Sequence, residues 1–143
     1  MIEKVELDGL IYGVIIRSNF YSSSIEFFTP NEFSQQLGYM NRPAGYIISP
    51  HVHRLVKREV LETKETLYIK SGRIRVDFYT DQKEYLTSRV LDAGDVILLA
   101  SGGHGFEIIE DAQIIEIKQG PYAGDLDKER FDIPGLIELN YGA

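Results

Sequence analysis

The sequence of 143 residues contains no cysteine, and this absence excludes several kinds of site. A disulfide framework, a zinc ribbon, an iron–sulfur cluster and a thiol nucleophile all require cysteine. Histidine is also scarce, with three copies, at positions 51, 53 and 104. Any transition-metal site must therefore be built from these three imidazoles and from carboxylates.

Long apolar runs and a basic surface are lacking as well. Acidic residues outnumber basic ones by 22 to 15, and the net charge of −7 argues against a nucleic-acid partner, which selects a basic surface. The longest apolar runs, around residues 10–16 and 96–100, are far shorter than a membrane span. The first six residues alternate and are acidic, without the apolar core of a signal peptide. We therefore expect a cytoplasmic protein with no membrane partner.

What the sequence does contain is a series of short β-rich segments between frequent turn residues. The strands expected from this pattern are residues 10–16, 24–28, 66–70, 73–80, 84–91, 96–99, 105–109 and 113–118, with a closing strand near 136–139. The turns expected between the central strands are Ser71-Gly72, Asp81-Gln82, residues 93–95 and residues 110–112. Short strands at nearly regular spacing predict an all-β sandwich or barrel, and the length predicts one domain over residues 1–143.

Two short helices are also predicted. Near the N-terminus, Thr29 is suited to cap a helix, Pro30 suits its first position, and Glu32 completes a capping box. This helix is expected to end before Gly38. The second helix is expected in the tail, near residues 125–130.

The expected strand at residues 73–80 has two distinct faces. Alternation places Ile74, Val76 and Phe78 on one face, and we expect this apolar face to point to the core. The opposite face, which we expect to meet solvent, holds Arg73, Arg75, Asp77 and Tyr79.

The three histidines occupy informative positions among these strands. His51 and His53 are two residues apart, so strand alternation places both side chains on one face. Glu65 opens an expected strand, and His104 lies in a glycine-rich bend that follows another. Three imidazoles and one carboxylate from adjacent strands suit a late first-row divalent metal. These four residues therefore predict a metal site.

The spacing of these residues resembles the first motif of the cupin superfamily, G-x5-H-x-H-x(3,4)-E-x6-G. Five residues separate Gly45 from His51, and six separate Glu65 from Gly72, as in the motif. The sequence departs from the motif between His53 and Glu65, where eleven residues stand in place of three or four.

The second cupin motif, G-x5-P-x-G-x2-H-x3-N, is matched in part. Gly94 and Gly102 fit this pattern. His104 comes one residue early, Ala100 stands at the proline position, and Ile108 stands at the asparagine position. The two motifs together cover about half of the chain.

The resemblance implies a small jelly-roll barrel, the cupin double-stranded β-helix, with a metal-motif core over residues 45–118 and with extra strands and the short helix on its N-terminal side. It implies a divalent transition metal, Fe, Mn, Zn or Ni, held by His51, His53, Glu65 and His104. Residues 54–64 are expected as an insertion at the barrel mouth, where Glu59 and Glu62 compete with Glu65 as ligands. The alternative is a cupin barrel that has lost its metal.

Cupins similar to this chain include isomerases, epimerases, dioxygenases, decarboxylases and non-enzymatic binders, and the fold does not choose among them. Our first hypothesis is an isomerase- or epimerase-like enzyme whose ion acts as a Lewis acid on a small polar or anionic, sugar-like metabolite. The alternatives are an iron-dependent dioxygenase and a non-catalytic ligand-binding or sensor cupin. We also expect a homodimer, because jelly-roll barrels commonly pair through exposed sheet edges, for which the N-terminal strands are candidates.

Four residues are candidates for contact with a small-molecule substrate: Ser49, Arg54, Arg58 and Lys118. Ser49 shares the face of His51, and Lys118 ends the last barrel strand. Arg54 and Arg58 belong to residues 54–75, which hold seven of the fifteen basic residues and only three acidic ones. This segment predicts either an electropositive rim that attracts a carboxylate or phosphate, or a solvated face of alternating charge.

Overall fold

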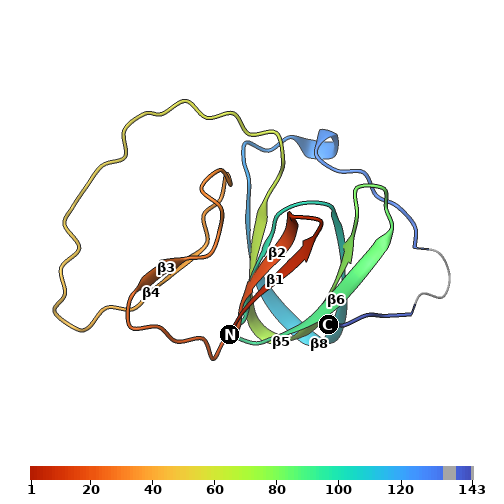
Figure 1. Ribbon diagram of the computed structural model, residues 1–143, viewed down its shortest axis with the longest axis horizontal. Coiled ribbons are helices and arrows are strands. Elements are labelled where there is room, and N and C mark those ends of the chain that lie inside the picture. The colour runs from red at the N-terminus through yellow and green to blue at the C-terminus, as the bar shows by residue number, and fades with distance from the viewer. Residues whose placement is uncertain (134–137, 143) are drawn as a thin grey trace.

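The computed structural model describes residues 1–133 and 138–142, and its regular secondary structure consists of β-strands and one short 3₁₀-helix (Figure 1). Its elements are β1 (Ile2–Leu7), β2 (Leu10–Ile16), β3 (Ile25–Phe27), β4 (Gly38–Met40), β5 (Glu65–Tyr79), β6 (Tyr85–Asp92), β7 (Val96–Leu99), β8 (Gly103–Lys118) and the 3₁₀-helix η1 (Gly124–Leu126). The main sheet has the order β1-β2-β7-β5-β6 with β8 paired to β5, and β3 pairs with β4 in a separate hairpin. The strand pairs are antiparallel. The all-β prediction is thus confirmed.

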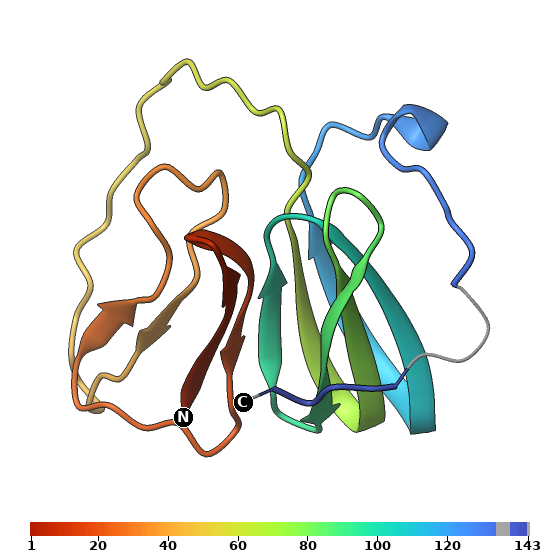
Figure 2. The same cartoon turned by 45° about the vertical axis from the view of Figure 1, so that its right-hand side comes forward.

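The main sheet curls into a half-barrel because β5 and β8 are long and bend together (Figures 1 and 2). The first part of β5, residues 65–68, lies between β7 and β8, and its second part, residues 73–79, lies between β6 and β8. Between these parts the register of β5 with β8 shifts repeatedly, from Ile69 to Ile74. Such shifts mark β-bulges, which bend a strand and increase its twist. Both ends of β8 therefore return to the end of the half-barrel where β5 begins.

The inner face of this curl holds the hydrophobic core. Its buried residues are Val5, Tyr12, Ile15, Leu67, Ile69, Ile74, Val76, Phe78, Leu91, Ile97 and Leu99. The predicted inward set of β5, Ile74, Val76 and Phe78, is fully buried, which confirms that face. Burying each of these side chains contributes about 1.5–3 kcal/mol, so the register of β5 is strongly specified.

The opposite face of β5 differs from the prediction, because Asp77 and Tyr79 are buried rather than exposed to solvent. Asp77 accepts hydrogen bonds from Arg75 and from Ser88 on β6. The C-terminal segment covers this region, since the carbonyl of Asn140 accepts a hydrogen bond from the amide of Ser88. The tail therefore takes the place of solvent over this part of the sheet.

The turns predicted at Ser71-Gly72 and at residues 110–112 are wrong, because β5 and β8 continue through these positions as bulges. Gly72 has a φ of +85°, and a Cβ atom there would lie 2.1 Å from the carbonyl oxygen of Asp111. The glycine therefore permits two bulged strands to approach closely, which is a different use from a hairpin turn. The turns predicted at Asp81-Gln82 and at residues 93–95 are present, as the connections from β5 to β6 and from β6 to β7.

The helix predicted after Thr29 is wrong, because this segment connects β3 to β4 without a helix. The Thr29 hydroxyl accepts a hydrogen bond from the Leu37 amide and donates one to the Gln36 side chain. The Gln36 amide group donates to the carbonyls of Pro30 and Phe33. These bonds satisfy the main chain within a compact loop, so the expected capping residue acts across the hairpin.

The C-terminal tail matches its predictions in part. The 3₁₀-helix η1 stands near the helix predicted at residues 125–130. Of the closing strand predicted near residues 136–139, residues 136 and 137 lie outside the described residues, and Glu138 and Leu139 are not in a strand. Strands β1 and β4 are additional to the predicted set. No helix in the described part of the chain is long and apolar enough to cross a membrane.

Candidate functional site

A cluster of ionisable side chains surrounds Glu65, at the end of the half-barrel where β5 begins. Glu65 is the first residue of β5 and is only 9% exposed. The Nε2 atom of His104 lies 3.5 Å from Oε2 of Glu65, and the Nζ atom of Lys118 lies 4.0 Å from its Oε1. A buried carboxylate thus stands between an imidazole and an ammonium group.

The bend in β5 and β8 brings these three residues together. Lys118 is opposite Glu65 in the register, whereas His104 is opposite Phe78, at the other end of β5. Because the bulges near Gly72 bend both strands, the two ends of β8 meet at the Glu65 carboxylate. Of the sequence-predicted residues, the structure therefore places Glu65, His104 and Lys118 in one cluster.

The neighbours of Glu65 favour its ionised form. The imidazole of His104 lowers the pKa of Glu65, burial opposes this effect, and the charge of Lys118 lowers the pKa further. Glu65 therefore remains an anionic acceptor to a lower pH than a solvated glutamate. Leu67 and Ile69, on the same face of β5, are buried and form an apolar wall beside it.

Lys118 also contacts the C-terminal tail. Its Nζ atom lies 3.1 Å from Oδ2 of Asp127, and Asp127 accepts a hydrogen bond from the Thr63 hydroxyl. The Thr63 hydroxyl and Lys118 lower the pKa of Asp127, and Asp127 in turn raises the pKa of Lys118. Thr63 and Asp127 are absent from the predicted site, because the acidic tail around Asp127 has the composition of a solvated surface turn.

His51 and His53 lie in the exposed segment between β4 and β5. The centroids of their rings are 5.3 Å apart. The Nδ1 atom of His51 lies 2.9 Å from the carbonyl oxygen of Ser49, which leaves Nε2 as the available ligand atom. Within residues 1–133 and 138–142, no three histidine, aspartate or glutamate side chains stand close enough to hold one metal ion. The four predicted ligands therefore form two separate pairs.

The other predicted substrate contacts have different surroundings. Ser49 contributes its main-chain carbonyl, which orients His51. Arg54 is exposed. Arg58 lines a surface pocket of about 560 Å³ beside the β3–β4 connection, together with Glu32 and Glu59. The charge of this pocket is therefore mixed rather than purely basic.

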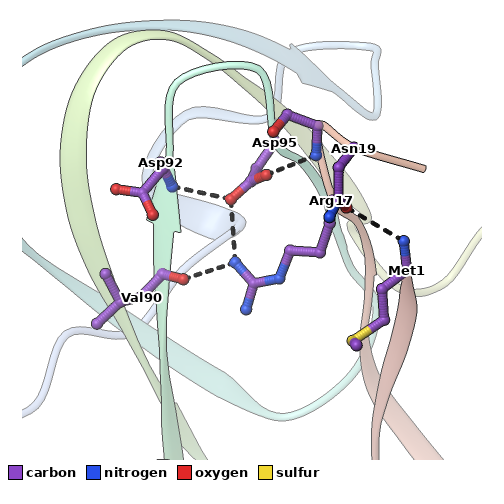
Figure 3. A pocket seen from close by; sticks show the side chains of 7 residues that line it. Met1, Arg17, Asn19, Val90, Asp92 and Asp95 are labelled. Carbon is purple, nitrogen blue, oxygen red and sulfur yellow. Dashed lines mark hydrogen bonds and ion pairs between the residues drawn. The ribbon is translucent and has the colours of Figure 1, made fainter.

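Another polar pocket, of about 420 Å³, is formed around Arg17 and Asp95 (Figure 3). Asp95 is buried and accepts hydrogen bonds from the amides of Ser18 and Asp92 and from Arg17 Nη1. Arg17 also donates to the carbonyl of Val90. Because these groups satisfy one another and tie the end of β2 to the β6–β7 turn, we interpret this pocket as structural.

A comparison with protein-family models finds no match, and searches of curated proteins and of solved structures find no significant match either. The function is therefore inferred from the residues of this chain and from their geometry.

Proposed function

We propose that the chain is a metal-binding, jelly-roll cupin that acts on a small polar or anionic, sugar-like metabolite. The observation that supports this proposal is the Glu65–His104 pair. These residues are expected ligands from the two separate cupin motifs, and the curled β5–β8 pair places them 3.5 Å apart. A carboxylate and an imidazole that converge from distant positions are suitable donors for Fe, Mn, Zn or Ni.

The chemistry of the four expected donors fits such an ion. The carboxylate of Glu65 is kept ionised by its neighbours, as a ligand must be. His51 directs Nδ1 at a main-chain carbonyl, which is the support that fixes the tautomer of a metal-binding histidine. A bound divalent ion would supply Lewis-acid chemistry of the kind that isomerases and epimerases use.

Lys118 and the apolar wall indicate which ligand the site favours. The Lys118 side chain is 30% exposed beside Glu65 and pairs with Asp127, so a carboxylate or phosphate that displaces Asp127 would meet its ammonium group. Leu67 and Ile69 are buried on the same face of β5 and make the inner side of the site apolar. A small anionic metabolite satisfies both features.

Metal analysis of protein purified without a histidine tag tests this proposal. We expect about one ion per chain in the wild type and loss of most of it in Glu65→Gln and in His104→Ala, because each variant removes a ligand atom. Glu110→Gln is the matched control, since it removes an exposed carboxylate on β8 that pairs with Arg73, and it should retain the ion. A wild-type protein without metal at any supply of Fe, Mn, Zn or Ni would contradict the proposal.

A further inference from the structure

Strand β8 has one edge without a partner strand in the part of the chain that the structure describes. It is 16 residues long, pairs with β5, and forms an outer edge of the curled sheet (Figure 2). An edge of this length presents a row of main-chain amide and carbonyl groups to any approaching strand. The half-barrel is therefore open along β8.

The side chains of β8 favour a partner that covers this opening. Phe106 and Ile108 lie opposite fully buried residues of β5, yet they are 44% and 53% exposed. Ile114, Ile115 and Ile117, in the other part of β8, are exposed as well. Apolar side chains gathered along a free strand edge favour docking, because each gains free energy when it is buried.

The segment between β4 and β5 has matching features, and we define its residues 41–58 as the arm. Six large apolar residues of the arm are exposed: Tyr46, Ile47, Ile48, Val52, Leu55 and Val56. From residue 47 to residue 58, no hydrogen bond joins the main chain of the arm to the main chain of another described residue. The arm therefore offers both an apolar surface and an unpaired main chain.

Charge also matches the arm to β8. The arm carries four basic residues and no acidic one: Arg42, Arg54, Lys57 and Arg58. Strand β8 carries four exposed acidic residues: Glu107, Glu110, Asp111 and Glu116. This complementarity favours the arm as the partner of β8 and disfavours the pairing of two β8 strands with each other.

The arm projects away from the β8 strand of its own chain. The chain that follows the arm is fixed where β5 begins, because Gln35 in the β3–β4 connection donates to the carbonyl of Lys64 and accepts a hydrogen bond from Thr66. Beyond this point the arm extends on the side opposite to β8 in both views (Figures 1 and 2). We propose that two copies of the chain exchange arms, so that the arm of each copy adds as a strand to the free edge of β8 in the other.

Arm exchange also completes the candidate metal site, and this part of the inference rests on the proposed function. Strand alternation places His51 and His53 on one face of the arm, together with Ile47. An antiparallel pairing that brings these histidines beside His104 carries Ile47 toward the exposed Ile108, which it covers. Each site then combines Glu65 and His104 of one copy with His51 and His53 of the other.

A cross-linking experiment tests arm exchange independently of any metal. Because the chain has no cysteine, Ile48→Cys on the arm and Glu107→Cys on β8, which lie opposite each other in this pairing, supply the only thiols. We expect light scattering to give a dimer, and a short bismaleimide to convert the double variant mainly to covalent dimer. The control, Ile48→Cys with Leu10→Cys at the start of β2, should give no covalent dimer. A monomer in solution, or a cross-link confined to single chains, would overturn arm exchange.

Mixing two metal-deficient variants tests whether the site is shared. His51→Ala/His53→Ala lacks the arm ligands, and Glu65→Gln/His104→Ala lacks the ligands of the half-barrel. When equal amounts are refolded together, mixed dimers hold one intact site of two, so about a quarter of the wild-type metal capacity should return. No recovery from variants that each fold and dimerise would overturn the shared site. If the double cysteine variant forms the covalent dimer while the wild type binds no metal, the proposed function is refuted and arm exchange remains supported.

Discussion

Asp77 is a charged residue that the strand pattern assigns to solvent and that the fold buries. Its carboxylate is satisfied by Arg75 on its own strand and by the Ser88 hydroxyl on β6. A buried carboxylate is stable only when charge and hydrogen bonds compensate for its lost hydration. These contacts therefore make Asp77 a structural residue of the sheet.

We expect Asp77→Ala to lower the free energy of unfolding by about 2 kcal/mol, because it removes a buried acceptor shared by Arg75 and the Ser88 hydroxyl, which keep only Glu107 and Tyr85 as side-chain partners. Urea denaturation followed by circular dichroism measures this change. Asp92→Ala is the matched control, since it also removes an aspartate that pairs with an arginine of β5, but at an exposed position. Equal losses of unfolding free energy in the two variants would show that the burial of Asp77 does not increase its contribution to stability.

The paired bulges of β5 and β8 are the elements that shape the half-barrel and assemble the candidate site. Gly72 is central to them, because its positive φ and the short approach to the Asp111 carbonyl both exclude a side chain. Without this bend, His104 and Lys118 stand at opposite ends of a long strand and cannot both reach Glu65.

Gly72→Ala should therefore destabilise the protein by about 2–4 kcal/mol, from left-handed backbone strain and from overpacking against β8. Gly9→Ala separates the two causes, because Gly9 also has a positive φ, +77°, but a Cβ atom there meets no atom within 4 Å. We expect it to cost about 1 kcal/mol. Thermal denaturation of both variants measures the difference, and an equal loss would exclude the steric contribution.

Local sequence pattern was sufficient to predict some elements and insufficient for others. Alternation and flanking turns act within a few residues, and they locate β2, β6 and β7 closely. The continuity of β5 and β8 is a property of their pairing, so Ser71-Gly72 has the composition of a turn but occupies a bulge. The capping signal at Thr29 failed for a related reason, because the same hydroxyl is bonded across the hairpin.

The residues of the candidate site also fall into those that the sequence predicted and those that it did not. The resemblance to the cupin motifs singled out Glu65 and His104, and the curled strands place these residues in contact. Thr63 and Asp127 follow from the return of the tail to the start of β5, a long-range contact that leaves no periodic signal in the sequence. The joining of His51 and His53 to this cluster stays a prediction, to be tested by the metal and mixing experiments.

At the scale of the whole molecule, β5 and β8 join the two parts of the half-barrel into one unit. Each strand contributes one segment to the part that contains β7 and another to the part that contains β6. We therefore expect equilibrium unfolding to be a single transition, with coincident midpoints from far-UV circular dichroism and from the fluorescence of the nine tyrosines. Midpoints that separate at one protein concentration would contradict this expectation.

The strands that the two parts share also limit where this chain can be cut or recombined with another protein. Along the chain, the strands of the part with β7 and of the part with β6 are interleaved. The two segments of β5 come first, then β6 and β7, and then the two segments of β8, the first of which pairs with the second segment of β5. A cut between Glu65 and Lys118 therefore removes strands from both parts at once, and neither fragment retains a complete set of neighbours. Recombination with another barrel inside this region should therefore yield insoluble chains.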